Sequence, residues 1–182
     1  MIEAGTYLLT ALITGGEISV CGVNPEELSS LVNTFSNSGA RFDIYEDGIS
    51  ATASPLRPIT VVAEAYPGFP TDLQPIAAAA LAKACGGFVC DTVFKSRYGY
   101  LDELASFGAV SEVTERGAFI YPSPDLTPAV AYAKDLRCGA AILSLALGIS
   151  GRSVIENSDM ILRGYEDVEK KLSSLGAKIE IL

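Results

Sequence analysis

An internal repeat constrains what this 182-residue chain can fold into. A Gly-Ala pair, with an acid four residues after the Gly and a β-branched residue next to that acid, occurs three times. The copies begin at Gly39, Gly108 and Gly176, so the pattern recurs about every 70 residues. In each copy an apolar Phe or Leu stands four residues before the Gly. This predicts an amphipathic helix that ends at a left-handed glycine and is followed by a strand. The alternative is three chance similarities, which the near-equal spacing disfavours.

A second helix and strand recur before each of these strings. Helices are predicted over 2–13, 72–84 and 135–147, each followed by a Gly-containing turn and a short strand. The runs Ile76–Leu81 and Ala140–Leu143 are apolar nearly all round, and helices of that kind are buried. Their small side chains would let the helices approach one another closely. We therefore expect three buried helices inside three outward-facing sheets.

The complete unit reads as strand, buried helix, strand, surface helix and hairpin, that is, a βαβαββ unit. Leading strands are predicted at 59–63 and 129–133, and hairpin turns just before Gly48 and Gly117. The predicted fold class is α/β (α+β), with a three-fold repeat of this unit.

We expect one domain over 1–182, divided into units at 1–54, 55–124 and 125–182. The first unit lacks a leading strand, and the third stops before its hairpin. An unpaired sheet edge invites pairing with other chains. We therefore expect a segment outside this chain to supply the missing strand, or else a neighbouring molecule or solvent to cover the edge.

Composition excludes several function classes. A net charge of -9 argues against nucleic-acid and membrane-surface binding, and 49% hydrophobic residues argue against disorder. Without histidine, the chain offers no His-based catalysis and no His-ligated metal. Its four cysteines form no CxxC pair, and the sequence has neither a signal-peptide layout nor a membrane-length apolar run. We expect a cytoplasmic protein with reduced thiols and no metal or cofactor.

Two acidic residues precede predicted buried helices. Asp72 follows Pro70-Thr71, and Asp135 follows Lys134. Taken alone, each acid suits a helix N-cap. The functional interpretation is a carboxylate at the mouth of a site, able to move a proton.

Three arginines suggest where an anion could bind. Arg137 lies in the first turn of a predicted helix, where caps usually favour acids, and so it needs another explanation. Arg163 precedes a Gly in a loop, and Arg97 follows a predicted strand; each is a solvated charge on the plain interpretation. Together they predict an anion-binding face near Asp72 and Asp135, without naming a reaction.

Five motifs in family order resemble the UDP-N-acetylglucosamine enolpyruvyl transferase (1-carboxyvinyltransferase) family, and they cover essentially the whole chain. The strings are Ile2-Glu3-Ala4-Gly5-Thr6-Tyr7-Leu8, Phe69-Pro70-Thr71-Asp72-Leu73-Gln74, Asp91-Thr92-Val93-Phe94 with Arg97, Asp135-Leu136-Arg137-Cys138-Gly139-Ala140-Ala141, and Arg163-Gly164-Tyr165-Glu166. The related 5-enolpyruvylshikimate-3-phosphate synthases share the fold, but their usual motifs look different at these places.

The resemblance implies a two-domain enzyme in which each domain is a three-fold inside-out α/β barrel. The substrates, phosphoenolpyruvate and UDP-N-acetylglucosamine, bind between the domains in such enzymes. This chain would be the C-terminal domain, and its partner would be the missing N-terminal domain. The family's loop cysteine and Lys-Asn pair belong to that other domain, so the resemblance implies no turnover by this chain alone.

Particular residues take on roles by motif position. Asp72 resembles the acid–base aspartate beside the sugar 3-hydroxyl, and Val93 resembles a residue whose backbone contacts the UDP-sugar. Arg163 resembles the arginine that engages phosphoenolpyruvate after closure. The pair Asp135 and Arg137 would lie at the domain cleft, with Arg97 supporting it. The catalytic set implied by the resemblance is Asp72, Asp135 and Arg163, and the substrate-binding set is Asp72, Val93, Arg97, Arg137 and Arg163.

Two other hypotheses stay open. One is a non-catalytic anion- or nucleotide-binding module that keeps the fold. The other is an enolpyruvyl transferase for a different acceptor, because most contacts to the sugar and nucleotide would come from the absent domain. A neighbouring reading frame that carries the loop cysteine would favour the transferase over the binding module.

Overall fold

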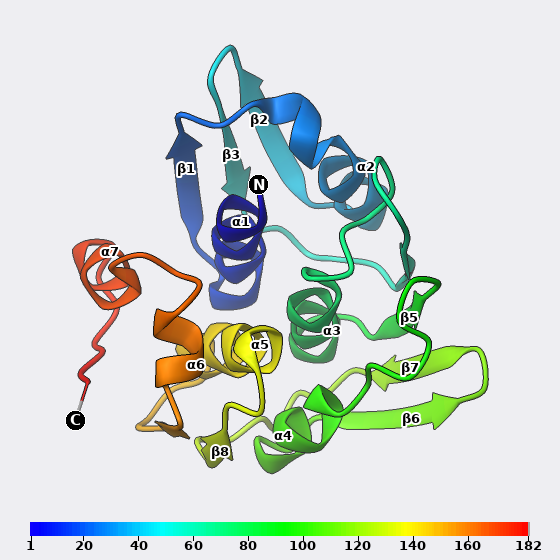
Figure 1. The fold of residues 1–182 in the computed structure, drawn as a ribbon, viewed down its shortest axis with the longest axis vertical. Helices are drawn as coiled ribbons and strands as arrows, with labels where there is room; N and C mark the ends of the chain where they lie inside the picture. The colour runs from blue at the N-terminus through cyan, green and yellow to red at the C-terminus, as the bar shows by residue number, and fades with distance from the viewer. Residues whose placement is uncertain (182) are drawn as a thin grey trace.

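The computed structural model describes residues 1–181 and shows a mixed α/β chain (Figure 1). Its elements follow one another as α1 (Ile2–Thr14), β1 (Glu17–Cys21), the 3-10 helix η1 (Pro25–Leu28), α2 (Ser29–Ser38), β2 (Arg41–Tyr45), β3 (Gly48–Thr52), β4 (Ile59–Ala63), α3 (Gln74–Lys83), β5 (Gly87–Asp91), α4 (Tyr100–Ser106), β6 (Val110–Thr114), β7 (Gly117–Tyr121), β8 (Val130–Tyr132), α5 (Leu136–Leu147), β9 (Val154–Glu156), α6 (Asp159–Leu162) and α7 (Val168–Ser174). Within these residues, no helix is both long enough and apolar enough to cross a bilayer.

Helices α1, α3 and α5 pack against one another in the middle of the molecule (Figure 1). Helix α3 is buried from Gln74 to Ala82, and α1 is buried from Ala4 to Ile13. The alanines of α3 and α5 are short enough to let the helix backbones approach closely, while Leu and Ile fill the remaining space. The prediction of three buried helices is confirmed.

Three sheets lie outside these helices (Figure 1). Their strand orders are β1-β3-β2, β4-β5-β7-β6 and β8-β9. The predicted hairpins are present, since β2 pairs antiparallel with β3 and β6 pairs antiparallel with β7. The leading strands are also present, because β4 runs parallel to β5 and β8 runs parallel to β9. In the first sheet, β1 pairs with β3 alone among the described residues.

The surface helices end as the repeat predicts. Gly39, Gly108 and Gly176 have φ angles of 112°, 91° and 97°, the left-handed region that a side chain disfavours. The apolar residue four positions earlier is buried in every copy: Phe35, Leu104 and Leu172.

One predicted strand is wrong. Residues 177–181 were expected to form a strand after the third glycine, but they have no regular structure. In the other two copies this strand is β2 or β6, and each pairs only with the second strand of its hairpin. No described strand takes that place after Gly176, so the backbone there lacks a ladder partner. The sheets have three, four and two strands, and the three-fold repeat and inside-out barrel therefore stay predictions.

Candidate functional site

Asp72 lies in the turn just before α3, but it does not cap that helix. The N-cap residue is Leu73, and no side chain caps it. Of the two interpretations of Asp72, the helix cap is therefore wrong. Its carboxylate is turned instead toward α5, where the Nε–H of Arg137 donates a hydrogen bond to Asp72 Oδ1. Asp72 thus pairs with Arg137 rather than with the backbone amides of α3, since a charged guanidinium is a stronger hydrogen-bond donor than an amide.

Arg97 reaches the same carboxylate from the loop after β5. Its Nη1 lies 3.7 Å from Asp72 Oδ1 and donates to Thr71 Oγ1 at 3.4 Å. The guanidinium also stacks on the ring of Phe94, 3.6 Å from its centroid. The side chains of Asp72, Arg97 and Arg137 are between 24% and 33% exposed, so a ligand could reach them. Two cations share one carboxylate, which leaves a net positive charge at this point.

Asp91 holds this loop in shape, and the sequence reasoning did not assign it a role. It is 4% exposed, and its Oδ1 accepts the backbone N–H groups of Val93 and Phe94 at 2.8 and 2.7 Å. Its Oδ2 accepts the hydroxyl of Thr71. An Asp at a strand end, followed by a turn, was a usable signal, since Asp commonly bonds the amides two and three residues on. Asp91 thus joins the Arg97 loop to the Asp72 turn.

Asp135 caps α5, as one of its two interpretations predicted. Its Oδ1 accepts the backbone N–H groups of Arg137 and Cys138, both at 2.8 Å. Next to it, the Nζ of Lys134 donates to the carbonyl oxygen of Gly99 at 3.0 Å and pairs with two acids of α4, Asp102 and Glu103. These contacts hold the first turn of α5 beside the Arg97 loop.

A pocket of about 70 Å³ opens between α3, α4 and the start of α5. Arg97, Lys134 and Arg137 contribute positive charge to it, Asp135 contributes one negative charge, and Tyr100 and Cys138 line it as well. Because the Asp135 carboxylate already accepts the first amides of α5, the three cationic side chains are what could attract an anion here. Such a pocket suits a phosphate or a carboxylate. Within residues 1–181, no three His, Cys, Asp or Glu side chains come together as a metal site.

Val93 lies in the loop that carries Arg97, and Arg163 follows α6. Val93 is 43% exposed, and its amide is occupied by Asp91, so its carbonyl is the backbone group left for a ligand. Arg163 ends α6 and is exposed, with Nη1 3.9 Å from Met160 Sδ. The structure therefore joins Asp72, Arg97 and Arg137 directly, while no contact joins Arg163 to them in the described chain.

A comparison with protein families matches residues 1–172 to the model described as EPSP synthase (3-phosphoshikimate 1-carboxyvinyltransferase). A UDP-N-acetylglucosamine 1-carboxyvinyltransferase of Kosmotoga olearia is 40% identical over 182 residues, which is 99% of this chain and 43% of that protein. The enzyme of the same name from Thermus thermophilus is also 40% identical, with the same coverage. The chain thus spans less than half the length of these relatives.

Solved structures show the same likeness. The enolpyruvyl transferase NikO from Streptomyces tendae superposes with a TM-score of 0.84 at 27% identity, over 98% of this chain and 43% of that one. The EPSP synthase from Acinetobacter baumannii gives a TM-score of 0.76 at 19% identity, over 100% of this chain and 46% of that one. The second likeness concerns the fold alone.

Proposed function

The chain belongs to the EPSP synthase (3-phosphoshikimate 1-carboxyvinyltransferase) family, and from this we propose that it is one domain of an enolpyruvyl transferase. The enzyme would transfer the enolpyruvyl group of phosphoenolpyruvate to the 3-hydroxyl of UDP-N-acetylglucosamine, a step in peptidoglycan precursor synthesis. The names of the relatives at 40% identity support this acceptor. The observation that carries the proposal is the carboxylate of Asp72 set between the guanidinium groups of Arg97 and Arg137.

The chemistry needs an acid–base group next to cations. In the first step, the sugar oxygen bonds to C2 of phosphoenolpyruvate, the hydroxyl loses its proton, and the methylene carbon gains one. In the second step, that carbon gives up a proton, the C2–O bond to phosphate breaks, and the double bond re-forms. We assign proton transfer to Asp72, which is one-third exposed and therefore reachable.

The arginines would hold the two anionic groups of phosphoenolpyruvate. Arg97 and Arg137 both approach one carboxylate oxygen, Oδ1 of Asp72, so their guanidinium groups converge on a point where an anionic oxygen can sit. We assign the phosphate-bearing end to Arg163 after closure, and a backbone contact with the sugar to Val93. We propose that Asp135 acts at the cleft by positioning Arg137, because its carboxylate accepts a hydrogen bond from the backbone N–H of Arg137.

The rest of the active site would come from the part of the enzyme that relatives carry beyond this match. We therefore propose that residues 1–182 form a single domain built from three βαβαββ units in an inside-out barrel, and that this domain is inactive alone. A strand from outside the chain would pair with β1, whose second edge is unpaired among the described strands. A cytoplasmic location is part of the proposal and is supported by four free cysteines.

The test is phosphate release from phosphoenolpyruvate with UDP-N-acetylglucosamine as the acceptor. We expect release from the chain reconstituted with the missing domain, and none from the 182-residue chain alone. Release by the chain alone would contradict the inactivity. Release that requires another acceptor sugar would contradict the substrate, and binding without any release would favour a non-catalytic module.

A further inference from the structure

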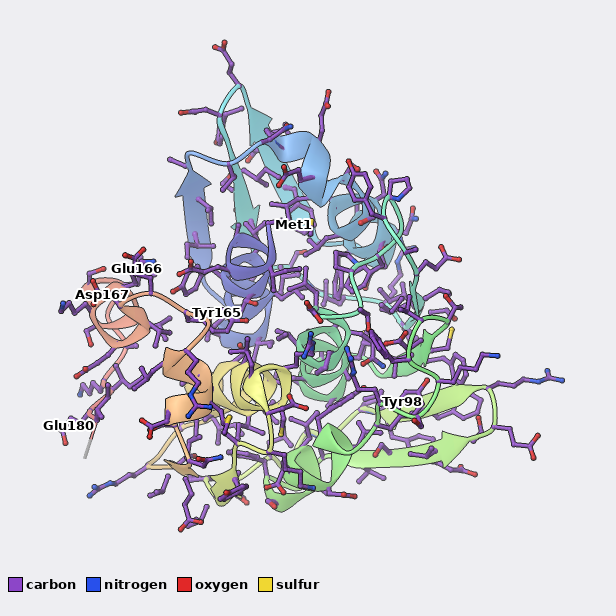
Figure 2. The ribbon with its side chains drawn as sticks, viewed as in Figure 1. Met1, Tyr98, Tyr165, Glu166, Asp167 and Glu180 are labelled. Atoms are coloured by element: carbon purple, nitrogen blue, oxygen red, sulfur yellow. The ribbon has the colours of Figure 1, made fainter. Side chains whose placement is uncertain are left out.

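We propose that Tyr165 is a positioning residue: its hydroxyl bond to Thr6 fixes the backbone that carries Arg163 against the start of α5. Figure 2 shows Tyr165 between α1 and the segment that joins α6 to α7. The role of Arg163 in this inference rests on the proposed function, whereas the anchoring rests on contacts in the structure.

The anchor is a buried hydrogen bond between residues 159 positions apart in the sequence. Tyr165 Oη lies 2.8 Å from Thr6 Oγ1, and the tyrosine is 5% exposed. The hydroxyl of Thr6 also donates to the carbonyl oxygen of Ile2 at 3.1 Å. A hydroxyl has a single proton, so when Thr6 donates to Ile2 it is Tyr165 that donates to Thr6.

Tyr165 keeps its hydroxyl proton over a wide pH range. Burial raises the pKa of its hydroxyl above the ordinary value, so the group keeps its proton at neutral pH. The charges of Glu3, Asp72 and Arg137 act on the same hydroxyl. The anchor therefore lies within electrostatic reach of the ion pair that carries the proposed function.

Gly164, between Arg163 and Tyr165, packs against the first residue of α5. A Cβ atom on Gly164 would lie 2.4 Å from Cδ2 of Leu136, so only a glycine fits there without movement of the leucine. Leu136 stands between Asp135 and Arg137 in the sequence. The backbone next to Arg163 thus touches the turn that presents Arg137.

A second contact holds the other side of this segment. Ile161 is 3% exposed and packs on Gly139 of α5, where an added Cβ would lie 2.5 Å from Ile161 Cγ1. With Ile161, Gly164 and Tyr165 all seated, the backbone of Arg163 is fixed on both sides. We therefore expect the Arg163 guanidinium to reach an anion by rotation about its side-chain bonds, while the backbone stays in place.

The experiment compares two buried hydroxyl pairs that both involve α1. Tyr165→Phe and Thr6→Val each remove the anchor but keep the volume of the side chain. The matched control is Thr10→Val, because Thr10 Oγ1 lies 2.8 Å from Ser144 Oγ and donates to the carbonyl oxygen of Thr6, and so joins α1 to α5 without bonding the Tyr165 hydroxyl. Thr6→Ser retains the hydroxyl and should behave like the unchanged chain.

The first readout is amide hydrogen exchange at Gly164 and Tyr165, whose N–H groups both donate to the carbonyl oxygen of Ile161. We expect exchange about five- to tenfold faster in Tyr165→Phe and Thr6→Val, with no change at these amides in Thr10→Val. The double variant Tyr165→Phe with Thr6→Val should be no worse than either single variant, because one bond is lost in all three. Equal exchange in Tyr165→Phe and Thr10→Val would overturn the proposal.

The second readout separates positioning from general stability. Inorganic phosphate is titrated into the chain reconstituted with the missing domain while the side-chain Nε–H signals of Arg163 and Arg97 are followed by NMR. We expect the apparent Kd reported by Arg163 to rise about fivefold in Tyr165→Phe, while the value reported by Arg97 stays unchanged. An equal rise at both arginines would overturn the positioning role. If phosphate moves neither signal in the unchanged chain, the proposed anion clamp fails, and the exchange comparison still decides the anchor.

Discussion

The guanidinium of Arg137 donates from its Nε–H directly to Oδ1 of Asp72, a residue 65 positions earlier in the chain. The two residues come from the beginnings of two buried helices, α5 and α3. Because α3 and α5 pack side by side, their N-terminal ends meet at one edge of the helix layer. A carboxylate and a cation are thereby brought together by helix packing.

Removing the charge of Asp72 should abolish most of the proposed activity. In the reconstituted two-domain protein, we expect Asp72→Asn to lower phosphate release by at least about 100-fold, since an amide cannot take up the proton. The control is Asp43→Asn, which removes the charge of an exposed acid on β2. Comparable rates for Asp72→Asn and Asp43→Asn would contradict the assignment of Asp72.

Arg137 should not tolerate replacement by lysine. An ammonium group keeps the charge but cannot reproduce the planar fork of a guanidinium. We expect Arg137→Lys to raise the KM for phosphoenolpyruvate about tenfold or more in steady-state assays. The control is Lys170→Arg, because the Lys170 side chain is 79% exposed and pairs with Asp167. This replacement should leave the KM unchanged. An unaltered KM in Arg137→Lys would exclude this arginine from phosphoenolpyruvate binding.

The capping role of Asp135 can be separated from a role in catalysis. Asp135→Ala should lower the free energy of unfolding by about 1 kcal/mol in urea titrations, because two helix amides lose their acceptor. Asp135→Ser should recover most of that loss, since a serine hydroxyl also caps. If Asp135→Ser restores stability but not phosphate release, the carboxylate has a second role; if it restores both, Asp135 is only a cap.

Gly87 should be intolerant of a side chain. Its φ is +154°, and a Cβ atom there would lie 2.3 Å from the carbonyl oxygen of Ile59 in the neighbouring strand. Neither backbone can yield without breaking the β4–β5 pairing, so we expect Gly87→Ala to cost about 3 kcal/mol or more in the free energy of unfolding. Gly99→Ala, with nothing within 4 Å of the added atom, is the control and should change stability little. Similar urea midpoints for both variants would refute the packing argument.

Cysteine reactivity should follow burial. Cys138 is 2% exposed, and burial raises the pKa of its thiol, so its thiolate fraction is small at neutral pH. Cys21 is exposed. We expect iodoacetamide at pH 8 to label Cys21 first and Cys138 last, as read by peptide mass spectrometry, and labelling of Cys138 to accelerate as the pH rises. Early labelling of Cys138 would mean that the start of α5 opens in solution.

Much of the fold was predictable because it depends on local chemistry. An all-apolar helix such as 76–81 must be buried, and a glycine such as Gly39 ends its helix because it accepts a left-handed conformation at little cost. The strand expected at 177–181 shows the limit of such reasoning. A strand requires hydrogen bonds from a partner, and the partner is not a property of the segment itself.

The candidate site, like the fold, was predictable in part from the sequence and in part only from the tertiary structure. The sequence by itself marked Asp72, Arg97, Arg137 and Arg163 as charges that the repeat did not need, and it determined that Asp135 could cap α5. Only the tertiary structure decided that Asp72 leaves its own helix unbonded and pairs with Arg137, that Asp91 joins two loops, and that Tyr165 reaches Thr6. Caps and glycine turns are decided within a few residues of the chain. A long-range ion pair depends on how two helices pack, and that choice belongs to the whole core.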